Sequence, residues 1–224
     1  MRQGRWIAFL LGLALIGALR IAHAEAGAQN EAERARGPAN AEQRILVVGD
    51  SLTAEYGLPR GSGWLTHIQK KLQGRDQAYQ IRNASISGDT TIGGLQRLPA
   101  LLNDFHPDFV VLQLGANDGL RGLPVSEMRA NLRKMIDLSQ AAGAKVLLIG
   151  QHVPPNYGPR YAREFHAVYG SVAEETGVAL VPFMLEGIAA DTAMFQADGL
   201  HPTAEAQAHI AETIWPQLEA LLGH

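Results

Sequence analysis

Short runs of consecutive apolar residues, ended by glycine, proline or polar residues, constrain this fold more than any other feature of the sequence. The clearest run, residues 45–48, stops at Gly49 and is followed at once by Asp50 and Ser51. Runs of this length are typical of strands that are buried on both faces, as in parallel sheets. Similar runs predict strands at residues 108–114, 145–150 and 178–182, and a polar–apolar alternation predicts a short strand at residues 79–83.

Amphipathic segments lie between the predicted strands. Residues 64–72 place Trp64, Ile68 and Leu72 on one face of a helix, and apolar residues at helical spacing predict further helices at about 92–102, 125–142, 165–172 and 203–222. Because right-handed crossovers place helices above and below a parallel sheet, we expect a three-layer α/β/α sandwich. The 224 residues, 46% of them hydrophobic, suit one domain of ordinary size.

The N-terminal segment differs in composition from the rest of the chain. Two arginines precede an apolar run at residues 6–19, and Ala22-His23-Ala24 supplies small residues at alternate positions. This is the layout of a secretory signal peptide, and the run is shorter than the ~20 residues that span a bilayer. We expect a signal peptide at residues 1–24, a flexible leader at 25–43 and a folded domain at 44–224. The mature protein is then periplasmic or secreted.

Composition also narrows the range of partners. The chain has no cysteine, which excludes disulfides and lipid-modified cysteine, and its net charge is −3 without a long run of Lys or Arg. Nucleic acid is therefore not an expected partner. No His-x-x-x-His pair or cysteine ligand set is present, so we expect neither a metal nor another cofactor. We further expect a monomer without a stable membrane anchor after signal cleavage.

Ser51 lies where ligands and chemistry collect in open α/β sheets, just beyond the carboxyl end of a strand. A serine nucleophile needs a base to take its proton and a group to orient that base. Among the eight histidines, His201 is distinctive because it follows Asp198 by three residues, in a loop broken by Gly199 and closed by Pro202. By itself, Asp-x-x-His before a helix is equally compatible with an N-cap and a surface histidine.

Donors for an oxyanion can also be named. They are the backbone N–H of Ser51, the backbone N–H of Gly88 and the side-chain amide of Asn117, and each follows its own predicted strand. Glycine and asparagine are common in turns, so any one of them is weak evidence. Because the carboxyl ends of parallel strands meet at one edge of the sheet, we expect these groups to converge.

Taken together, these residues resemble the GDSL or SGNH hydrolase family. The resemblance rests on four blocks in the order of the family, namely Gly49-Asp50-Ser51-Leu52, Gly88, Gly115-Ala116-Asn117-Asp118 and Asp198-Gly199-Leu200-His201-Pro202. It covers roughly residue 44 to the C-terminus and is closest to the bacterial periplasmic thioesterase, lysophospholipase and arylesterase group. In the nucleophile block, Glu55 stands where related members often have a small residue, and neither Glu55 nor Tyr56 has an assigned role.

The resemblance implies a flavodoxin-like sandwich with strand order 2-1-3-4-5 and a serine esterase acting through an acyl-enzyme. Ser51 would be the nucleophile, His201 the base and Asp198 the orienting acid, with Ser51, Gly88 and Asn117 forming the oxyanion hole. The expected substrates are carboxylic esters and acyl thioesters or lysophospholipids. Apolar residues on the loops at the same edge are candidates for an acyl-chain groove: Leu120, Leu123, Pro154, Tyr157 and Met184. A carbohydrate-deacetylating esterase and a non-enzymatic periplasmic binding domain remain as alternatives.

Overall fold

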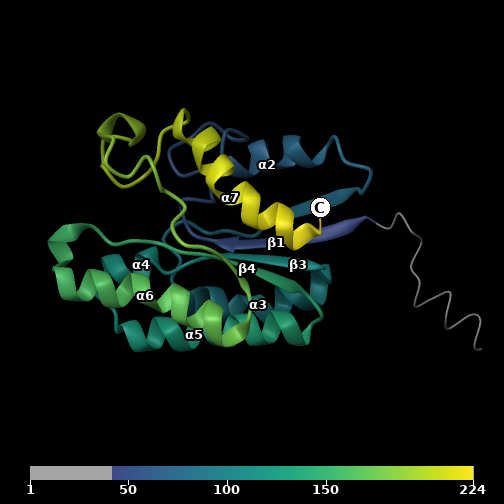
Figure 1. Ribbon diagram of the computed structural model, residues 1–224, viewed down its shortest axis with the longest axis horizontal. Coiled ribbons are helices and arrows are strands. Elements are labelled where there is room, and N and C mark those ends of the chain that lie inside the picture. The colour runs from purple at the N-terminus through teal and green to yellow at the C-terminus, as the bar shows by residue number, and fades with distance from the viewer. Residues whose placement is uncertain (1–41, 224) are drawn as a thin grey trace, which may run out of the picture. The chain divides into compact units, whose positions relative to one another are not determined.

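The structure, a computed structural model, describes residues 42–223, in which five parallel strands form one sheet with helices on both faces (Figure 1). The strands are β1 (Gln43–Gly49), β2 (Tyr79–Asn83), β3 (Phe109–Gln113), β4 (Lys145–Ile149) and β5 (Ala179–Val181). Their order in the sheet is β2-β1-β3-β4-β5. The predicted α/β/α sandwich and the strand order implied by the resemblance are both confirmed.

The predicted signal peptide and nearly all of the predicted leader lie outside the described residues. Gln43, which closes the predicted leader, is already the first residue of β1, and its backbone N–H donates a hydrogen bond to Ala78 O at 2.9 Å. In the described part of the chain, no helix is both long enough and apolar enough to cross a bilayer.

Side chains alternate between the two faces of β1 and build two separate cores. Ile45 and Val47 pack in one core with the helices α2 (Trp64–Leu72) and α7 (Ala206–Leu222). Leu46 and Val48 pack in the other core with α3 (Thr91–Phe105), α5 (Val125–Ala141) and α6 (Pro159–Thr176). Figure 1 shows these two groups of helices on opposite sides of the sheet. Burial of alternate residues on both faces explains why the strand is a continuous apolar run.

Two features at the carboxyl edge differ from the sequence prediction. A short helix, α4 (Ala116–Leu120), follows β3 where only a turn was expected, and the 3₁₀ helices η1 (Pro155–Tyr157) and η2 (Thr192–Met194) lie in other loops. In addition, α7 begins at Ala206 and not at residue 203. The reason is that the preceding segment pairs with η2 and its flank: Thr203 N–H donates to Met194 O at 2.8 Å.

Candidate active site

Ser51 lies in a tight turn directly after β1. The Ala54 N–H donates to Asp50 O at 2.9 Å and closes this turn. The turn sits close against β3, because a Cβ on Gly49 would lie only 2.7 Å from Oε1 of Gln113. Glycine is therefore required at position 49 for Ser51 to emerge at this point of the sheet.

A buried polar network holds the turn from beneath. Asp50, Thr53 and Gln113 are each 2% exposed or less. The Gln113 side chain donates from Nε2 to Asp50 Oδ1 at 2.9 Å and accepts at Oε1 from the Thr53 hydroxyl at 2.6 Å. Asp50 Oδ1 also accepts the Leu52 N–H at 3.1 Å. The backbone around Ser51 is thus fixed to the end of β3 by side chains that have no contact with solvent.

His201 connects Ser51 to Asp198. The imidazole Nε2 lies 2.9 Å from Ser51 Oγ, and Nδ1 lies 2.7 Å from Asp198 Oδ2. The other carboxylate oxygen, Oδ1, accepts the backbone N–H groups of Leu200 at 2.9 Å and His201 at 3.0 Å. The Asp198 carboxylate therefore orients both the imidazole and the loop that carries it.

The charge of Asp198 determines which imidazole nitrogen carries the proton. The backbone N–H of His201 is the largest cause that lowers the pKa of Asp198 from 3.8 to about 2, with further help from Leu200 N–H and the imidazole. An ionised carboxylate can only accept, so Nδ1 must be the donor in this pair. Nε2 is then left as the acceptor for the Ser51 hydroxyl, which is the arrangement that a general base requires.

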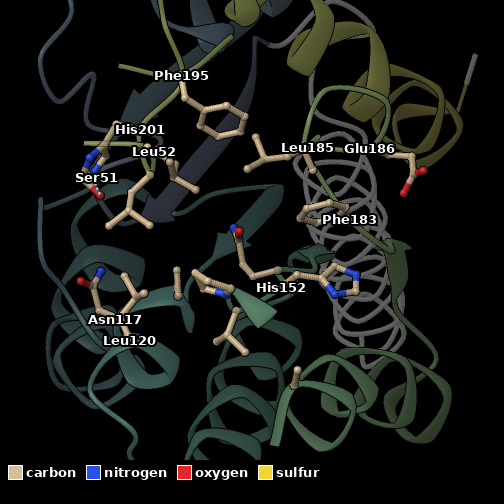
Figure 2. Close-up of a pocket in the computed structure, with 18 of the residues that line it drawn as sticks. Ser51, Leu52, Asn117, Leu120, His152, Phe183, Leu185, Glu186, Phe195 and His201 are labelled. Carbon is tan, nitrogen blue, oxygen red and sulfur yellow. Dashed lines mark hydrogen bonds between the residues drawn. The ribbon is translucent and has the colours of Figure 1, made fainter. Parts of the chain in front are cut away.

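Asn117 reaches the same place from the first turn of α4, and Figure 2 shows it with Ser51 and His201 on one side of a pocket. Gly88 does not line that pocket. The segment that carries it is nevertheless tied to α4 at two points, because Arg121 donates to Gly88 O at 2.7 Å and Thr91 N–H donates to Asp118 Oδ2 at 2.8 Å. The structure thus brings Ser51, Asn117 and His201 together and places Gly88 on a loop fixed beside them.

The pocket is a cavity of about 740 Å³ that extends away from Ser51. Of the five predicted groove residues, Leu120 and Pro154 line it. Most of its wall is apolar and also includes Leu52, Val153, Ala162, Phe183, Leu185, Phe195 and Leu200. A cavity with this size and lining is typical of sites for small or mid-sized apolar ligands.

The other three predicted groove residues lie away from the cavity wall. Met184 is fully buried in the core beneath α7, and the Gln151 amide contacts its sulfur. The Tyr157 ring packs against the opposite core and its hydroxyl donates to Leu120 O at 2.7 Å. The carbonyl of Leu123 accepts the Tyr161 hydroxyl at 3.0 Å, so that loop faces α6. Tyr157 thus supports a wall residue without lining the wall itself.

Side chains after β4 and β5 close the end of the cavity away from Ser51. His152 stacks on His166 with ring centroids 3.7 Å apart and meets the edge of Phe183 at 4.4 Å. Burial, and then the nearby charge of His166, lower the pKa of His152, while Glu186 opposes this shift. Figure 2 shows His152, Phe183 and Glu186 on the side opposite Ser51. The sequence prediction missed these residues, although they follow strands at the same edge of the sheet.

The chemistry available at this edge is that of a polarised serine. Within residues 42–223, no group of three or more His, Cys, Asp or Glu side chains is arranged to hold a metal ion. Ser51, His201 and Asp198 instead form a continuous hydrogen-bonded chain at one end of an apolar cavity. Such a chain at the carboxyl edge of an α/β/α sandwich is the arrangement of the class of serine hydrolases.

Comparison with known proteins places the chain within that class. The sequence profile of the GDSL-like Lipase/Acylhydrolase family matches residues 47–209. Esterase TesA of Pseudomonas aeruginosa is 51% identical over 182 residues, which are 81% of this chain and 90% of that protein. Thioesterase 1/protease 1/lysophospholipase L1 of Escherichia coli K12 is 40% identical over 186 residues, which are 83% of this chain and 88% of that protein.

A solved structure agrees with these sequence matches. The psychrotrophic esterase EstA from Pseudoalteromonas sp., inhibited by monoethylphosphonate in that structure, is 40% identical with a TM-score of 0.77, covering 82% of this chain and 100% of that chain. The chain therefore belongs to the GDSL-like Lipase/Acylhydrolase family, and it is an enzyme of that hydrolase family.

Proposed function

We propose that this protein is a serine esterase that hydrolyses carboxylic esters of apolar acids, and acyl thioesters or lysophospholipids, through an acyl-enzyme. Ser51 is the nucleophile, His201 the base and Asp198 the orienting acid. The observation that carries the proposal is the chain from Ser51 Oγ to His201 Nε2 at 2.9 Å and from His201 Nδ1 to Asp198 Oδ2 at 2.7 Å. The names of the relatives, which include an esterase and a thioesterase, support the same reaction class.

In the first half of the proposed reaction, Ser51 Oγ attacks the substrate carbonyl carbon while His201 Nε2 takes its proton. The carbonyl oxygen becomes an oxyanion, which the backbone N–H groups of Ser51 and Gly88 and the amide of Asn117 stabilise. Collapse of the tetrahedral intermediate breaks the bond to the alcohol or thiol, and the imidazolium returns its proton to that leaving group. In the second half, His201 deprotonates a water that releases the acid and restores Ser51.

The cavity wall favours an apolar acyl group over a sugar. Sugar hydroxyls need several hydrogen-bonding side chains, whereas the wall is mostly apolar and its polar side chains beyond Ser51, Asn117 and His201 are Gln151, His152 and Glu186. A binding domain without activity would gain nothing from an ionised Asp198 that fixes one tautomer of His201. A panel of aryl esters, acyl-CoAs, lysophospholipids and acetylated sugars separates these substrate classes, and acetylated sugars as the best substrates would contradict the proposal.

The first prediction concerns Ser51. Ser51→Ala is expected to lose nearly all hydrolysis of a p-nitrophenyl ester, because no nucleophile remains, while it unfolds at the same temperature as the wild type. Ser171→Ala, which changes a partly exposed serine on α6 outside the cavity, is the matched control and keeps its activity. A fluorophosphonate probe should label the wild type and Ser171→Ala but not Ser51→Ala. Wild-type turnover by Ser51→Ala would remove Ser51 from the mechanism.

We also propose that residues 1–24 direct export and that the mature enzyme acts as a monomer in the periplasm or outside the cell. The charged, apolar and small-residue segments at the N-terminus support export. Mass spectrometry of the exported protein should place its N-terminus at Glu25, and light scattering should give the mass of one chain. A retained N-terminal segment, or the mass of a dimer, would contradict the respective part of this proposal.

A further inference from the structure

Glu55 organises the loop that follows the nucleophile. Its φ is +59°, which is uncommon for a residue with a side chain. Its carboxylate accepts the backbone N–H of Gly61 at 2.8 Å and of Gly63 at 2.7 Å. One side chain therefore closes the whole segment between Ser51 and α2. Glu55 thus fixes the conformation of this loop, including the neighbouring Tyr56.

Gln196 joins this loop to the loop that carries His201. Its side-chain Nε2 donates to Tyr56 O at 2.9 Å and to Pro202 O at 3.0 Å. Its backbone N–H donates to His201 O at 2.8 Å. The amide also fills the space beside Gly57, because a Cβ there would lie 2.1 Å from Gln196 Oε1. Gln196 thus bonds to the residues on both sides of the gap between the two loops.

The ring of Tyr56 lies against the imidazole of His201. The two ring centroids are 4.5 Å apart, with the planes inclined at 39°. Tyr56 is 51% exposed, so it adds little to the hydrophobic core. Its position covers a face of the imidazole, whose two nitrogens are already directed to Ser51 and Asp198. The imidazole is thereby held by contacts in its plane and by the Tyr56 ring against its face.

We infer that Tyr56 and Gln196 are positioning residues for His201 in ester hydrolysis. Gln196 fixes the distance between the nucleophile loop and the histidine loop, and Tyr56 holds the imidazole in the orientation that reaches Ser51. When His201 takes the serine proton it becomes a cation, and an aromatic ring beside a cation stabilises it. Tyr56 is therefore expected to matter more in the transition state than in the substrate complex. This inference rests on the proposed role of His201.

The experiment compares kcat and KM of Tyr56→Ala and Tyr56→Phe on a p-nitrophenyl ester. We expect Tyr56→Ala to lower kcat roughly threefold to tenfold with KM unchanged within about twofold, because its contact is with the base and not with the substrate. Tyr56→Phe keeps the ring and should retain wild-type kcat. Ile92→Ala, which truncates a side chain that is 46% exposed on α3, is the control for loss of a surface apolar group. It should leave both constants unchanged.

A double-mutant cycle tests whether Tyr56 acts through His201. In a His201→Ala background, Tyr56→Ala should not reduce the residual activity further, since the imidazole it positions is gone. Gln196 provides a second arm, in which Gln196→Glu replaces the donating amide by an oxygen facing two carbonyl oxygens. Gln196→Glu should therefore lower kcat more than Gln196→Ala. Gln69→Glu, at an exposed position on α2, is the matched control for Gln196→Glu.

The outcomes separate this inference from the proposed function. If Ser51→Ala is inactive but Tyr56→Ala keeps wild-type kcat, the positioning role is wrong and the esterase mechanism stands. If Tyr56→Ala lowers activity by the same factor in the wild type and in His201→Ala, the positioning role is also wrong, since the effect does not pass through the imidazole. If Ser51→Ala stays active, the proposed function itself fails. Melting temperatures of all variants separate loss of folding from loss of kcat.

Discussion

The carboxyl group of Asp50, next to Ser51, is unfavourably placed for an ionisable group. It is completely buried, and burial raises its pKa from 3.8 to about 6, against the opposing effect of the Gln113 amide. Only one of its oxygens is satisfied: Oδ2 has no hydrogen-bond partner among the residues that the structure describes. Ionising this group inside the protein is therefore unfavourable, and at neutral pH the folded state carries that cost.

Asp50→Asn is expected to stabilise the protein at neutral pH. Asparagine keeps the oxygen that accepts from Gln113 and Leu52, and it removes the charge that burial disfavours. Between the unfolded pKa of 3.8 and the folded pKa of about 6, the wild-type folded state keeps a proton that the unfolded chain has released, so its stability falls as pH rises. At higher pH the variant should be more stable by up to about 3 kcal/mol.

Urea unfolding at about pH 4 and about pH 8 measures this difference. At the lower pH, where Asp50 is protonated in the folded state, the free energies of unfolding of the variant and the wild type should agree within about 1 kcal/mol. Asp76→Asn, the same change at an exposed position, should show no gain at either pH. A variant that is equally or less stable than the wild type at the higher pH would show that the folded protein tolerates the Asp50 charge.

Residues with reactive side chains could be predicted individually, whereas most of the cavity wall beyond Leu120 and Pro154 could not. Ser51, Asn117 and the Asp198–His201 pair each follow a local pattern that can be read within a few residues. Phe183 and Phe195 line the cavity only because loops distant in sequence meet there. An apolar side chain on a loop is equally compatible with packing, as Met184 illustrates by lying entirely in the core.

At the scale of single elements, the first turn of α2 lacks a local cap. Its N-cap residue is Gly63, and no side chain caps the helix there. The first helical N–H, that of Trp64, instead donates to Oε1 of Gln207 in α7 at 3.0 Å, across 143 residues. Gln207 in turn donates from Nε2 to Thr203 O at 3.1 Å. The two helices that cover one face of the sheet are therefore joined by a buried amide.

Gln207→Leu is expected to destabilise the protein by about 1–3 kcal/mol, because it leaves the buried Trp64 N–H without its acceptor at almost unchanged volume. Urea unfolding at constant pH measures the change. Gln69→Leu, which places the same substitution on the exposed side of α2, is the control and should have little effect. Equal stability of Gln207→Leu and the wild type would mean that another group or water replaces the amide.

Elements defined by local periodicity could be predicted from the sequence, and those defined by distant partners could not. The apolar run of β1 and the amphipathic pattern of α2 are complete within a few residues, and both were placed correctly within two residues. The start of α7 was predicted three residues too early, because the pairing of Thr203 with Met194 competes with the helix. The short helix α4 has too few residues to show a periodic pattern.

At the scale of the whole molecule, the cavity exists because loops from four strands meet above one edge of the sheet. Ser51 follows β1, Asn117 follows β3, and the residues after β4 and β5 form the opposite wall. Neighbouring strands lie about 4.8 Å apart, so the wall after β4 is about 10 Å from Ser51 across β3. An acyl chain bound as proposed would therefore extend across the sheet, from β1 towards β5.

Ala162 lines the cavity from α6, which follows β4, and enlarging it should shorten the cavity without touching Ser51. For a series of p-nitrophenyl esters from acetyl to palmitoyl, Ala162→Phe is expected to lower kcat/KM for long chains roughly tenfold or more while leaving the acetyl ester unchanged, because only long chains reach α6. Ala167→Phe, an exposed alanine on the same helix outside the cavity, should leave the whole series unchanged. A uniform loss of kcat/KM over all chain lengths would indicate that Ala162→Phe disturbs the fold, and its melting temperature would then be lowered. An unchanged series for a stably folded Ala162→Phe would mean that acyl chains do not occupy the cavity between β1 and β5.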